Sequence, residues 1–424
     1  MSWITHNGRR VPAKPDDTVA SALYRAGVRV FSRSVKLHRP RGLYCGVGKC
    51  GQCMMRIGGA PSVRACMTPV REGLSVEDQN CWPSARWDVY GLLRFTPRSF
   101  DPQRAGIGLP QARPLFHAIV RRMAGWGTVP DPIEPQQVGA VERRDVDLLV
   151  VGSGPSGLSA AISAAQAGAR VLVLEENPRL GGRLARERGD LAARLLARAR
   201  SLGVELHARA TVAGIYPEGD VAAVFPDRLV RLRPRRIVLA TGAPEAGDRF
   251  PNNDLPGVMS LSCALELASR DVAPGRRIVV VGDDERGVTL KVLLDGRAKV
   301  TLLPEARVLR ARGFSRLRSI VVSDGGRKRR VRADVLCVAA TRRPAIELAQ
   351  QAGASLVERH GALVPATDAD GRCAPGVFAC GDLVAPGGIE AAMVSGERVG
   401  AAAARSGSQL SADPPLRTGV AAHV

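Results

Sequence analysis

A glycine-rich turn constrains the fold of this chain more than any other sequence feature. Residues 147–151 are mostly apolar, the turn Gly152-Ser153-Gly154-Pro155-Ser156-Gly157 follows, and an Ala-rich segment runs on to residue 167. This order predicts a buried strand, a tight turn and a helix. The first glycine allows the turn, the second lets a pyrophosphate approach the backbone, and the third lets helix and strand pack closely. We therefore expect the turn residues Gly152, Gly154, Pro155, Ser156 and Gly157 to bind a nucleotide.

An acidic residue after the next apolar run supports this prediction. Residues 171–174 form that run and Glu175 follows it, where a carboxylate can accept hydrogen bonds from ribose hydroxyls. A second apolar run, 277–281, leads into Gly282-Asp283-Asp284-Glu285-Arg286-Gly287. Asp284 replaces the middle glycine there, and the added carboxylates repel a pyrophosphate. The pattern predicts an α/β protein with two Rossmann-type folds, of which the second has lost nicotinamide binding.

Four cysteines near the N-terminus form the second informative pattern. Cys45, Cys50, Cys53 and Cys66 have the spacing C-x4-C-x2-C, followed by a fourth cysteine after twelve residues. Glycines between the first three let the backbone fold round a cluster and aim its amides at sulfur. The spacing is typical of plant-type [2Fe-2S] sites, and a structural zinc site is the alternative. We expect these cysteines to be the metal ligands.

The surrounding segments predict a small β-grasp domain over 1–96. Residues 3–12 read as a hairpin with Asn7-Gly8 at its turn, Thr18 as the N-cap of a helix ending near residue 26, and 54–57 as a strand. A Pro-rich linker over 97–145, with a short helix over 115–123, is expected next. The first nucleotide fold then covers 146–250 and 365–405, with the second inserted over 251–364. The tail, 406–424, is expected to be disordered.

The charge of the chain is strongly positive. Lys and Arg number 61 against 40 Asp and Glu, giving a net charge of +21. No acidic residue lies between Asp17 and Glu72, a stretch that holds ten basic ones. Cations near a cluster favour its reduced, more negative form, so we expect a cluster that is easier to reduce than that of acidic ferredoxins; docking of a partner explains the cations equally well. Basic residues that are scattered, with few aromatics, argue against nucleic-acid binding.

No apolar run reaches the length of a membrane span, and the first residues have no secretory pattern, so we expect a cytoplasmic protein. The other five cysteines show no C-x-x-C pairing. We expect them to be buried small side chains, which argues against a redox disulfide: Cys81, Cys263, Cys337, Cys373 and Cys380.

Several motifs beyond the first turn resemble those of flavoproteins with two dinucleotide-binding domains. The resemblance covers nearly all of residues 146–405 and includes Glu175-Glu176, the Gly-Gly turn before Arg183, Ala240-Thr241-Gly242, and Gly381-Asp382 in a G-V-F-A-C-G-D segment. It implies FAD as the nucleotide, with Asp382 at the ribityl chain. The residues that this resemblance adds to the nucleotide site are Glu176, Gly182, Arg183, Thr241, Gly242, Gly381 and Asp382.

The whole chain is also similar to the α subunits of heterotetrameric sarcosine oxidase and its relatives. These are the opine oxidases, hydrogen cyanide synthase and multisubunit proline or hydroxyproline dehydrogenases. The resemblance rests on residues 35–42, 81–84 and 251–259. It implies an FAD-containing β subunit that oxidises the amine, further small subunits, and FMN between the α and β subunits. In that group the nucleotide of the α subunit is FAD, NAD or ATP. Unlike sarcosine oxidase α subunits, this chain has the cluster cysteines and ends near residue 424, which argues against a folate-dependent reaction.

We therefore expect an oxidoreductase subunit acting on CH–NH donors, which relays electrons from the β subunit through its [2Fe-2S] cluster. Two alternatives remain open: a self-contained NAD(P)H-dependent flavoprotein reductase, and a non-catalytic assembly scaffold. No Ser-His-Asp or paired-carboxylate pattern is legible, so the catalytic residues are unknown.

Overall fold

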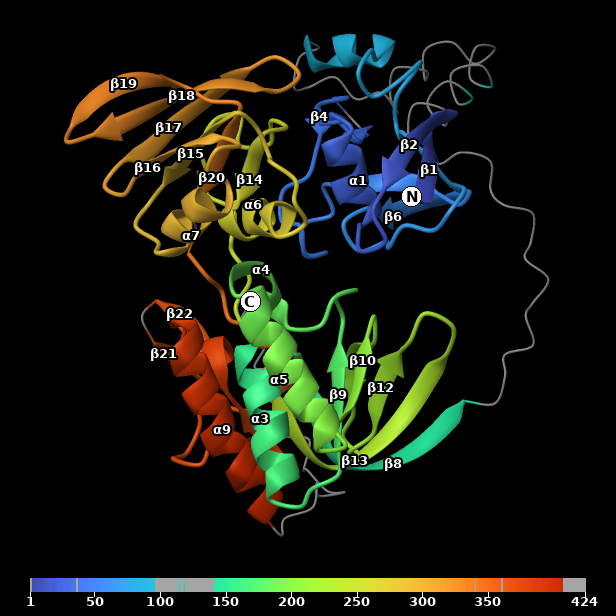
Figure 1. Ribbon diagram of the computed structural model, residues 1–424, viewed down its shortest axis with the longest axis vertical. Coiled ribbons are helices and arrows are strands. Elements are labelled where there is room, and N and C mark those ends of the chain that lie inside the picture. The colour runs from blue at the N-terminus through green and yellow to red at the C-terminus, as the bar shows by residue number, and fades with distance from the viewer. Residues whose placement is uncertain are drawn as a thin grey trace, which may run out of the picture. The chain divides into compact units, whose positions relative to one another are not determined.

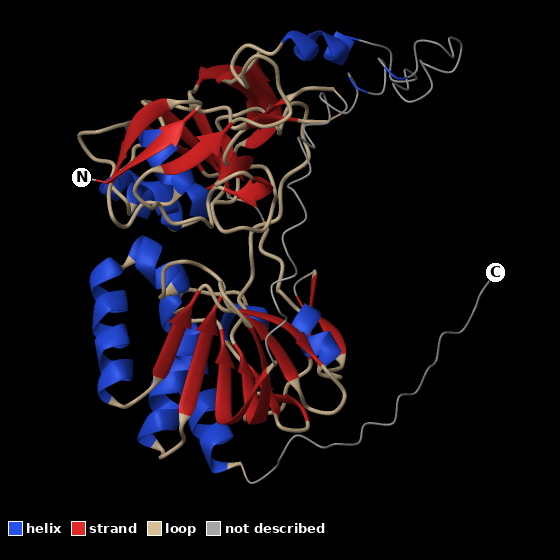
Figure 2. Ribbon diagram, turned by 90° about the vertical axis from the view of Figure 1, so that its right-hand side faces the viewer, coloured by secondary structure: helices blue, strands red, loops and turns tan. Residues whose placement is uncertain are grey.

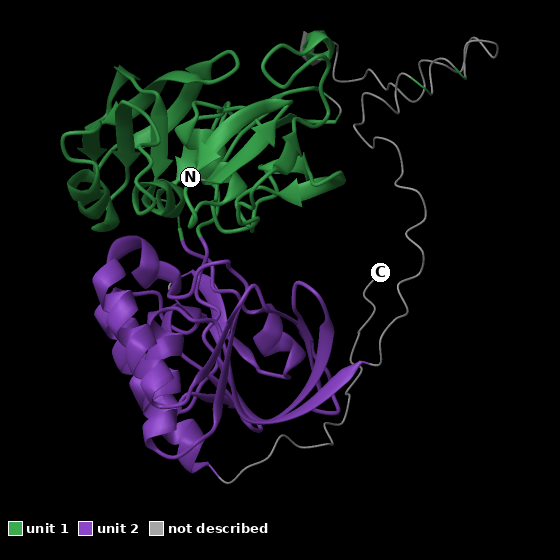
Figure 3. Ribbon diagram, turned by 45° about the vertical axis from the view of Figure 1, so that its right-hand side comes forward, with its two compact units in different colours: residues 1–136, 245–341 green, residues 137–244, 342–424 purple. Residues whose placement is uncertain are grey.

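In the computed structural model the chain forms two compact units, which are described separately below (Figure 3). The structure describes residues 2–35, 37–95, 141–339, 341–359 and 361–406, together with 114 and 118. Unit 1 comprises Met1–Gln136 and Glu245–Thr341, and unit 2 comprises Gln137–Pro244 and Arg342–Val424.

Unit 2 is built on an eight-stranded sheet with the order β10-β9-β8-β13-β12-β11, in which β24 pairs with β13 and β23. Strands β8, β9, β10, β13 and β24 pair in parallel, as predicted for βαβ units. β13 is long enough to pair with β24 at its end and antiparallel with β12 at its start. The bounds are β8 Glu142–Val151, β9 Val171–Glu175, β10 Glu205–Ala208, β11 Thr211–Ile215, β12 Val221–Val224, β13 Leu229–Leu239, β23 Arg372–Ala374 and β24 Val377–Ala379.

Most of the helices line one side of this sheet, and one short helix packs on the other (Figure 2). α3 and α9 pack closely because glycines on α9 leave room for the α3 backbone: a Cβ at Gly400 would lie 2.2 Å from the carbonyl oxygen of Ala160. The helices are α3 Pro155–Gln166, α4 Gly182–Glu187, α5 Gly189–Ser201, α8 Glu347–Gln351 and α9 Ile389–Arg405, with the 3₁₀ helix η3 Gly381–Leu383. A hairpin of β21 Leu356–Arg359 and β22 Ala362–Pro365 completes the described part of unit 2.

The N-terminal part of unit 1 has the predicted β-grasp form. Its sheet has the order β2-β1-β7-β5-β6, with β1 antiparallel to β2 and parallel to β7. Asn7 and Gly8 have the positive φ angles of a tight hairpin turn, and Thr18 caps α1, so both sequence predictions are confirmed. The bounds are β1 Ser2–His6, β2 Arg9–Ala13, α1 Val19–Arg25, β3 Ser32–Arg33, β4 Pro40–Arg41, β5 Met54–Ile57, β6 Ala60–Arg64, β7 Leu74–Glu77 and the 3₁₀ helix η1 Val89–Phe95.

The second part of unit 1 contains a four-stranded parallel sheet, β14-β20-β15-β16, and a three-stranded antiparallel sheet, β17-β18-β19. Figure 1 shows the two sheets in yellow and orange. Val308, Ile320 and Val322 of the antiparallel sheet lie in the core, because successive side chains on a strand point to opposite faces. The bounds are β14 Val258–Ser260, α6 Leu261–Ala268, β15 Arg277–Val281, α7 Arg286–Leu293, β16 Lys299–Leu303, β17 Arg307–Gly313, β18 Leu317–Asp324, β19 Arg327–Arg332 and β20 Val335–Val338.

One hydrophobic core joins the two parts of unit 1. It contains Leu43 and Cys53 of the N-terminal part together with Leu261, Cys263 and Leu265 of the second part. Segments about two hundred residues apart in the sequence therefore share one buried interior. The β-grasp part and the second nucleotide-type fold are thus packed as one body.

Several sequence predictions need correction or stay open. The first strand of unit 2 begins at Glu142, within the expected linker, and α3 begins at Pro155, within the predicted glycine turn. Cys81 and Cys373 are only half-buried, because each lies at the edge of its fold, whereas the other three non-ligand cysteines are buried. The predicted helix over 115–123 lies outside the described residues, except for residue 118, and so does the tail beyond residue 406. The proposed domain boundaries stay a prediction.

Candidate functional site: a nucleotide turn and a cysteine loop

The first glycine turn joins β8 to α3, and its backbone is in close contact with its neighbours. Gly152 has a φ of 101°, and a Cβ there would lie 2.4 Å from the carbonyl oxygen of Ala240. A Cβ at Gly157 would lie 1.9 Å from the carbonyl oxygen of Gly152. At Gly154, in contrast, a Cβ would meet no atom within 4 Å. The middle glycine therefore faces open space at the helix N-terminus, where a phosphate group fits.

Glu175 fixes the conformation of this turn. Its carboxylate is buried and accepts four hydrogen bonds, two from the amide and hydroxyl of Ser153 at 2.9 and 2.8 Å and two from the backbone and side chain of Asn177 at 2.9 and 2.7 Å. A carboxylate has about four acceptor sites. A ribose hydroxyl would therefore share or replace one of these bonds, so Glu175 also has a structural role that the sequence motif did not indicate. Glu176, the next residue, is half-buried.

The remaining predicted nucleotide residues converge on the same turn. A Cβ at Gly182 would lie 2.9 Å from the Cα of Gly154, and one at Gly381 would lie 2.3 Å from the Ser156 hydroxyl. Ala240, whose carbonyl group contacts Gly152, precedes Thr241 and Gly242, and the Thr241 hydroxyl donates to the carbonyl oxygen of Ala345 at 2.9 Å. Segments of unit 2 that are far apart in the sequence thus surround the turn.

Asp382 lies between two arginines. Its Oδ2 accepts a hydrogen bond from Arg342 at 3.0 Å and lies 3.9 Å from Nη1 of Arg183, while Oδ1 accepts from the amide of Gly387 at 3.0 Å. Arg183 also donates to Glu187 at 2.8 Å. Arg342 was not predicted from the sequence. The available signal was its position a few residues after the end of the buried strand β20. These cations can offset the charge of a bound dinucleotide.

The second glycine turn, between β15 and α7, is filled by its own side chains. Asp284 accepts from the amide of Arg286 at 3.0 Å and from its guanidinium at 2.9 Å. The same guanidinium lies 2.6 Å from Oε1 of Glu245 and donates to the Ser262 hydroxyl at 3.1 Å. The side chains of Arg286 and Glu245 are each 3% exposed. Protein carboxylates thus surround the arginine at the turn where a pyrophosphate would need cations and open backbone amides.

The cysteine loop holds its four thiols close together. Cys45, Cys53 and Cys66 are buried and Cys50 is exposed, and hydrogen bonds link Cys45 with Cys50 and Cys66, and Cys53 with Cys66. The amide of Lys49 donates to Sγ of Cys45 at 3.3 Å, and that of Gln52 to Sγ of Cys50 at 3.5 Å. Among the described residues no group of three or more His, Cys, Asp or Glu is placed to hold a metal ion.

The thiols of the loop affect one another's ionisation. Hydrogen bonds from Cys50 and then Cys66 lower the pKa of Cys45, and the same contacts raise the pKa values of Cys50 and Cys66. Gly46 and Gly48 have φ angles of 68° and 76°, and a Cβ at Gly48 would lie 2.8 Å from Sδ of Met67. Four sulfur donors, amides directed at two of them and a backbone that requires glycine fit a thiolate-ligated iron-sulfur cluster.

Four of the nine described basic residues around the loop have acidic partners that the sequence did not reveal. Arg25 pairs with Asp17, Arg33 lies 3.9 Å from Asp88, Arg39 lies 3.3 Å from Asp254 and Arg56 lies 3.8 Å from Glu77. Arg41 donates to Gln52 at 3.2 Å. Lys36 is outside the described residues. The positive charge near the cysteines is therefore smaller than the count over 18–71 suggests.

A second concentration of cations lies on the outer face of the β17–β19 sheet. The register places six exposed basic side chains on one face, three on β17 and three on β19, and none of the six forms an ion pair with a described residue. The expectation that the basic residues are scattered is thus wrong in three dimensions. The six are Arg307, Arg310, Arg312, Lys328, Arg330 and Arg332.

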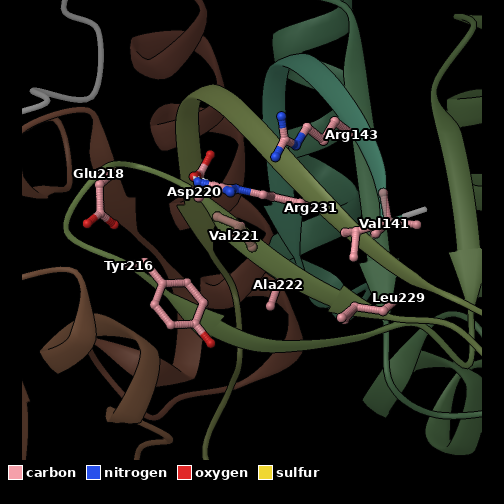
Figure 4. A pocket seen from close by; sticks show the side chains of 10 residues that line it. Val141, Arg143, Tyr216, Glu218, Asp220, Val221, Ala222, Leu229 and Arg231 are labelled. Carbon is pink, nitrogen blue, oxygen red and sulfur yellow. Dashed lines mark hydrogen bonds and ion pairs between the residues drawn. The ribbon is translucent and has the colours of Figure 1, made fainter. Parts of the chain in front are cut away.

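A cavity of about 370 Å³ lies elsewhere in unit 2, on the sheet near β8, β12 and β13 (Figure 4). Tyr216 and Leu229 line it together with Asp220 and Arg231, which form an ion pair. Burial opposes ionisation of Asp220, but hydrogen bonds from Arg231 and Arg233 lower its pKa. No residue of the predicted nucleotide or cysteine sites lines this cavity.

Comparison with known protein families identifies both cofactor regions. Residues 3–81 match the family described as 2Fe-2S iron-sulfur cluster binding domain, and residues 147–219 match the family described as FAD dependent oxidoreductase. The [2Fe-2S] and FAD predictions are confirmed at this level. The chain is 31% identical over 404 residues to sarcosine oxidase subunit alpha of Rhizobium meliloti, which covers 82% of this chain and 40% of that protein.

The chain is thus similar to a sarcosine oxidase alpha subunit and to related oxidase subunits. It is also 28% identical to an opine oxidase subunit of Agrobacterium tumefaciens, over 61% of this chain and 65% of the relative, and 38% identical to hydrogen cyanide synthase subunit HcnA of Pseudomonas aeruginosa, over 18% and 70%. The chain spans about 40% of the length of the first relative. L-proline dehydrogenase from P. horikoshii shares the fold, with a TM-score of 0.71 and 23% identity over 94% of this chain and 72% of that one. Of the helices that the structure describes, none is long and apolar enough to cross a membrane.

Proposed function

We propose that this chain is the nucleotide- and cluster-binding α subunit of a multisubunit amine or amino-acid dehydrogenase or oxidase. The observation that carries the proposal is that one chain holds both an open nucleotide turn at Gly154 and a loop of four adjacent cysteine thiols. Its relatives are named as subunits of oxidases for sarcosine and opines, which are amines. The substrate is therefore expected to be a secondary amine, an opine or a proline-like amino acid.

The reaction would start on a partner subunit that contains FAD. There the amine would lose a hydride from carbon to FAD and a proton from nitrogen, and water would hydrolyse the resulting imine. FAD would supply acceptance of two electrons together and a [2Fe-2S] cluster transfer of one at a time, so that the two electrons could reach a one-electron acceptor in turn. FMN at the interface with the partner would serve the same relay.

The residues of this chain have distinct parts in this proposal. Cys45, Cys50, Cys53 and Cys66 would ligate the cluster. The open backbone at Gly154 would receive the pyrophosphate of FAD, with NAD or ATP as alternatives at this site. Arg183 and Arg342 hold Asp382 beside Gly381, close to the turn, where its carboxylate would accept hydrogen bonds from the nucleotide. In this proposal no side chain of the chain acts on the amine itself.

The test is to purify the full chain with its co-purifying subunits and add amine substrates without oxygen. The expected result is a cluster signal in electron paramagnetic resonance (EPR) after addition of a secondary amine or proline-like substrate, and none after addition of NADH or NADPH. A signal that develops with NADH in the isolated chain would favour the self-contained reductase. The filled turn at Asp284 and Arg286 argues against that alternative. Absence of iron and sulfide would favour a scaffold.

A further inference from the structure

The second nucleotide-type fold contacts the cysteine loop directly. A Cβ at Gly46, next to the ligand Cys45, would lie 3.2 Å from the Cα and 3.3 Å from the Sγ of Cys263. Cys263 is in the first turn of α6 and is fully buried. The amide of Ser260, the N-cap of α6, donates to the carbonyl oxygen of Tyr44 at 3.0 Å. The loop is thus held at both Tyr44 and Gly46 by the start of one helix.

The contact extends into a continuous interior. Leu43, Cys53 and Cys66 of the cysteine region lie in the same core cluster as Leu261 and Cys263. Figure 1 shows α6 beside the blue N-terminal module within unit 1. Protein interiors are close-packed, so a change of volume at this contact displaces the loop or leaves a void. The second fold therefore controls the packing behind the cysteines.

The same fold lacks an open phosphate site. Its glycine turn is occupied by the buried contacts among Asp284, Arg286 and Glu245. Glu245 in turn accepts a hydrogen bond from the amide of Ser262, in the first turn of α6, at 3.1 Å. The charged groups that fill the turn thus also hold the helix that contacts the cysteine loop.

We propose that the second nucleotide-type fold is the packing surface that holds the cysteine loop in place. In this proposal Cys263 is a positioning residue for the cluster ligands Cys45 and Cys53. This inference rests on the proposed cluster but not on the proposed amine reaction. Cys263 is fully buried, and its Sγ lies against the loop backbone beside Cys45. Its role is to fill space and exclude water next to the cluster.

The test uses the full chain with its co-purified subunits and reduces the cluster chemically, so that neither substrate nor electron transfer from a partner is needed. Cys263→Ala is compared with Cys337→Ala, a matched control. Cys337 lies in the same core, is equally buried and sits on β20 rather than against the loop. The readouts are the midpoint potential and EPR spectrum of the cluster, its iron and sulfide content, and the melting temperature.

We expect Cys263→Ala to change the reduction equilibrium constant about tenfold or more, which is about 59 mV for one electron, and to alter the EPR spectrum. Cys337→Ala should leave both unchanged while lowering the melting temperature by a similar amount. Equal shifts in the two variants, or no shift in either, would overturn the proposal. If Cys263→Ala does not fold, Cys263→Ser gives the same comparison with nearly conserved volume.

A binding measurement tests the other half of the proposal. NADH and NADPH are titrated into the Gly154→Val variant, in which the first nucleotide turn is blocked and only the second remains. No binding at millimolar concentration is expected. Saturable binding of NADH or NADPH that is lost on changing the second turn would show that the second fold is a nucleotide site. It would overturn the proposal that this fold serves only as a packing surface for the cysteine loop. Either result leaves the amine reaction to be judged by its own test.

Discussion

The two glycine turns of this chain have the same position in their folds, but one is open and the other is filled by side chains. Gly154 in the first turn faces open space, whereas Asp284 in the second folds back onto Arg286. The first turn is bordered by two arginines that both lie beside Asp382, one of which also pairs with Glu187, and the second turn by one arginine between two carboxylates. The same strand-turn-helix scaffold can thus accept a phosphate or supply its own charged filling. In the second case the fold is free to serve as a packing surface, here for the cysteine loop.

The strongest test of this comparison is to add one methyl group to the last glycine of each turn. In Gly157→Ala the new Cβ would lie 1.9 Å from the backbone oxygen of Gly152, which cannot move without breaking the turn. In Gly287→Ala it would lie 3.2 Å from a side-chain carbon of Leu302, which can adjust. We expect the first change to destabilise its unit by more than about 3 kcal/mol and the second by less than about 1 kcal/mol. Chemical denaturation measures both, and equal losses would contradict the difference in packing.

The filling of the second turn is tested by removing its arginine. Arg286→Met removes the cation beside the buried carboxylate of Glu245 and the half-buried one of Asp284, and such a change usually costs about 3–5 kcal/mol. Arg342→Met, at the first turn, leaves Asp382 with the amide of Gly387 and with Arg183 nearby. Its expected loss is below about 1.5 kcal/mol. Thermal unfolding of the two variants ranks them, and a larger loss for Arg342→Met would show that the first turn is the one with essential internal charges.

A smaller effect is expected where the second fold meets the cysteine loop. Gly46 and Gly51 have similar φ angles, 68° and 65°, so alanine introduces similar backbone strain at both. A Cβ at Gly46 contacts Cys263 at 3.2 to 3.4 Å, whereas one at Gly51 has only Met54 within 4 Å, at 3.5 Å. Gly46→Ala should therefore lose more iron than Gly51→Ala. Beyond the strain that both share, we expect its apparent free energy of cluster binding to be weaker by about 1 kcal/mol. Iron retention during chelator challenge measures this, and the reverse order would argue against contact through Cys263.

Local patterns predicted much of both sites. The first turn, its flanking strands and the cysteine loop are each encoded within a few tens of residues, so spacing and periodicity identify them. The later residues of the nucleotide site, such as Gly381 and Asp382, followed only from resemblance to flavoproteins. The closeness of Gly381 to the hydroxyl of Ser156 depends on how η3 packs on α3.

Contacts between distant segments were beyond sequence reasoning. Nothing near Cys45 indicates that Cys263 packs against its loop, because the two are more than two hundred residues apart. The same holds for Arg39, which pairs with Asp254, and it explains why the charge near the cysteines was overestimated. The cationic face of β17–β19 emerges only when the strand register aligns residues from two separate segments.

We propose that the first turn holds the FAD of this chain and that the cysteine loop independently holds the cluster. The most direct test is to measure the cofactor content of Gly154→Val. A side chain at this position meets no protein atom at its Cβ but occupies the space where the pyrophosphate would approach. The purified variant, with its co-purifying subunits, is analysed for iron, acid-labile sulfide and FAD beside the wild type. We expect wild-type iron and sulfide content and the loss of the FAD bound by this chain. Retention of that FAD, or its loss together with iron and sulfide in a folded protein, would contradict it.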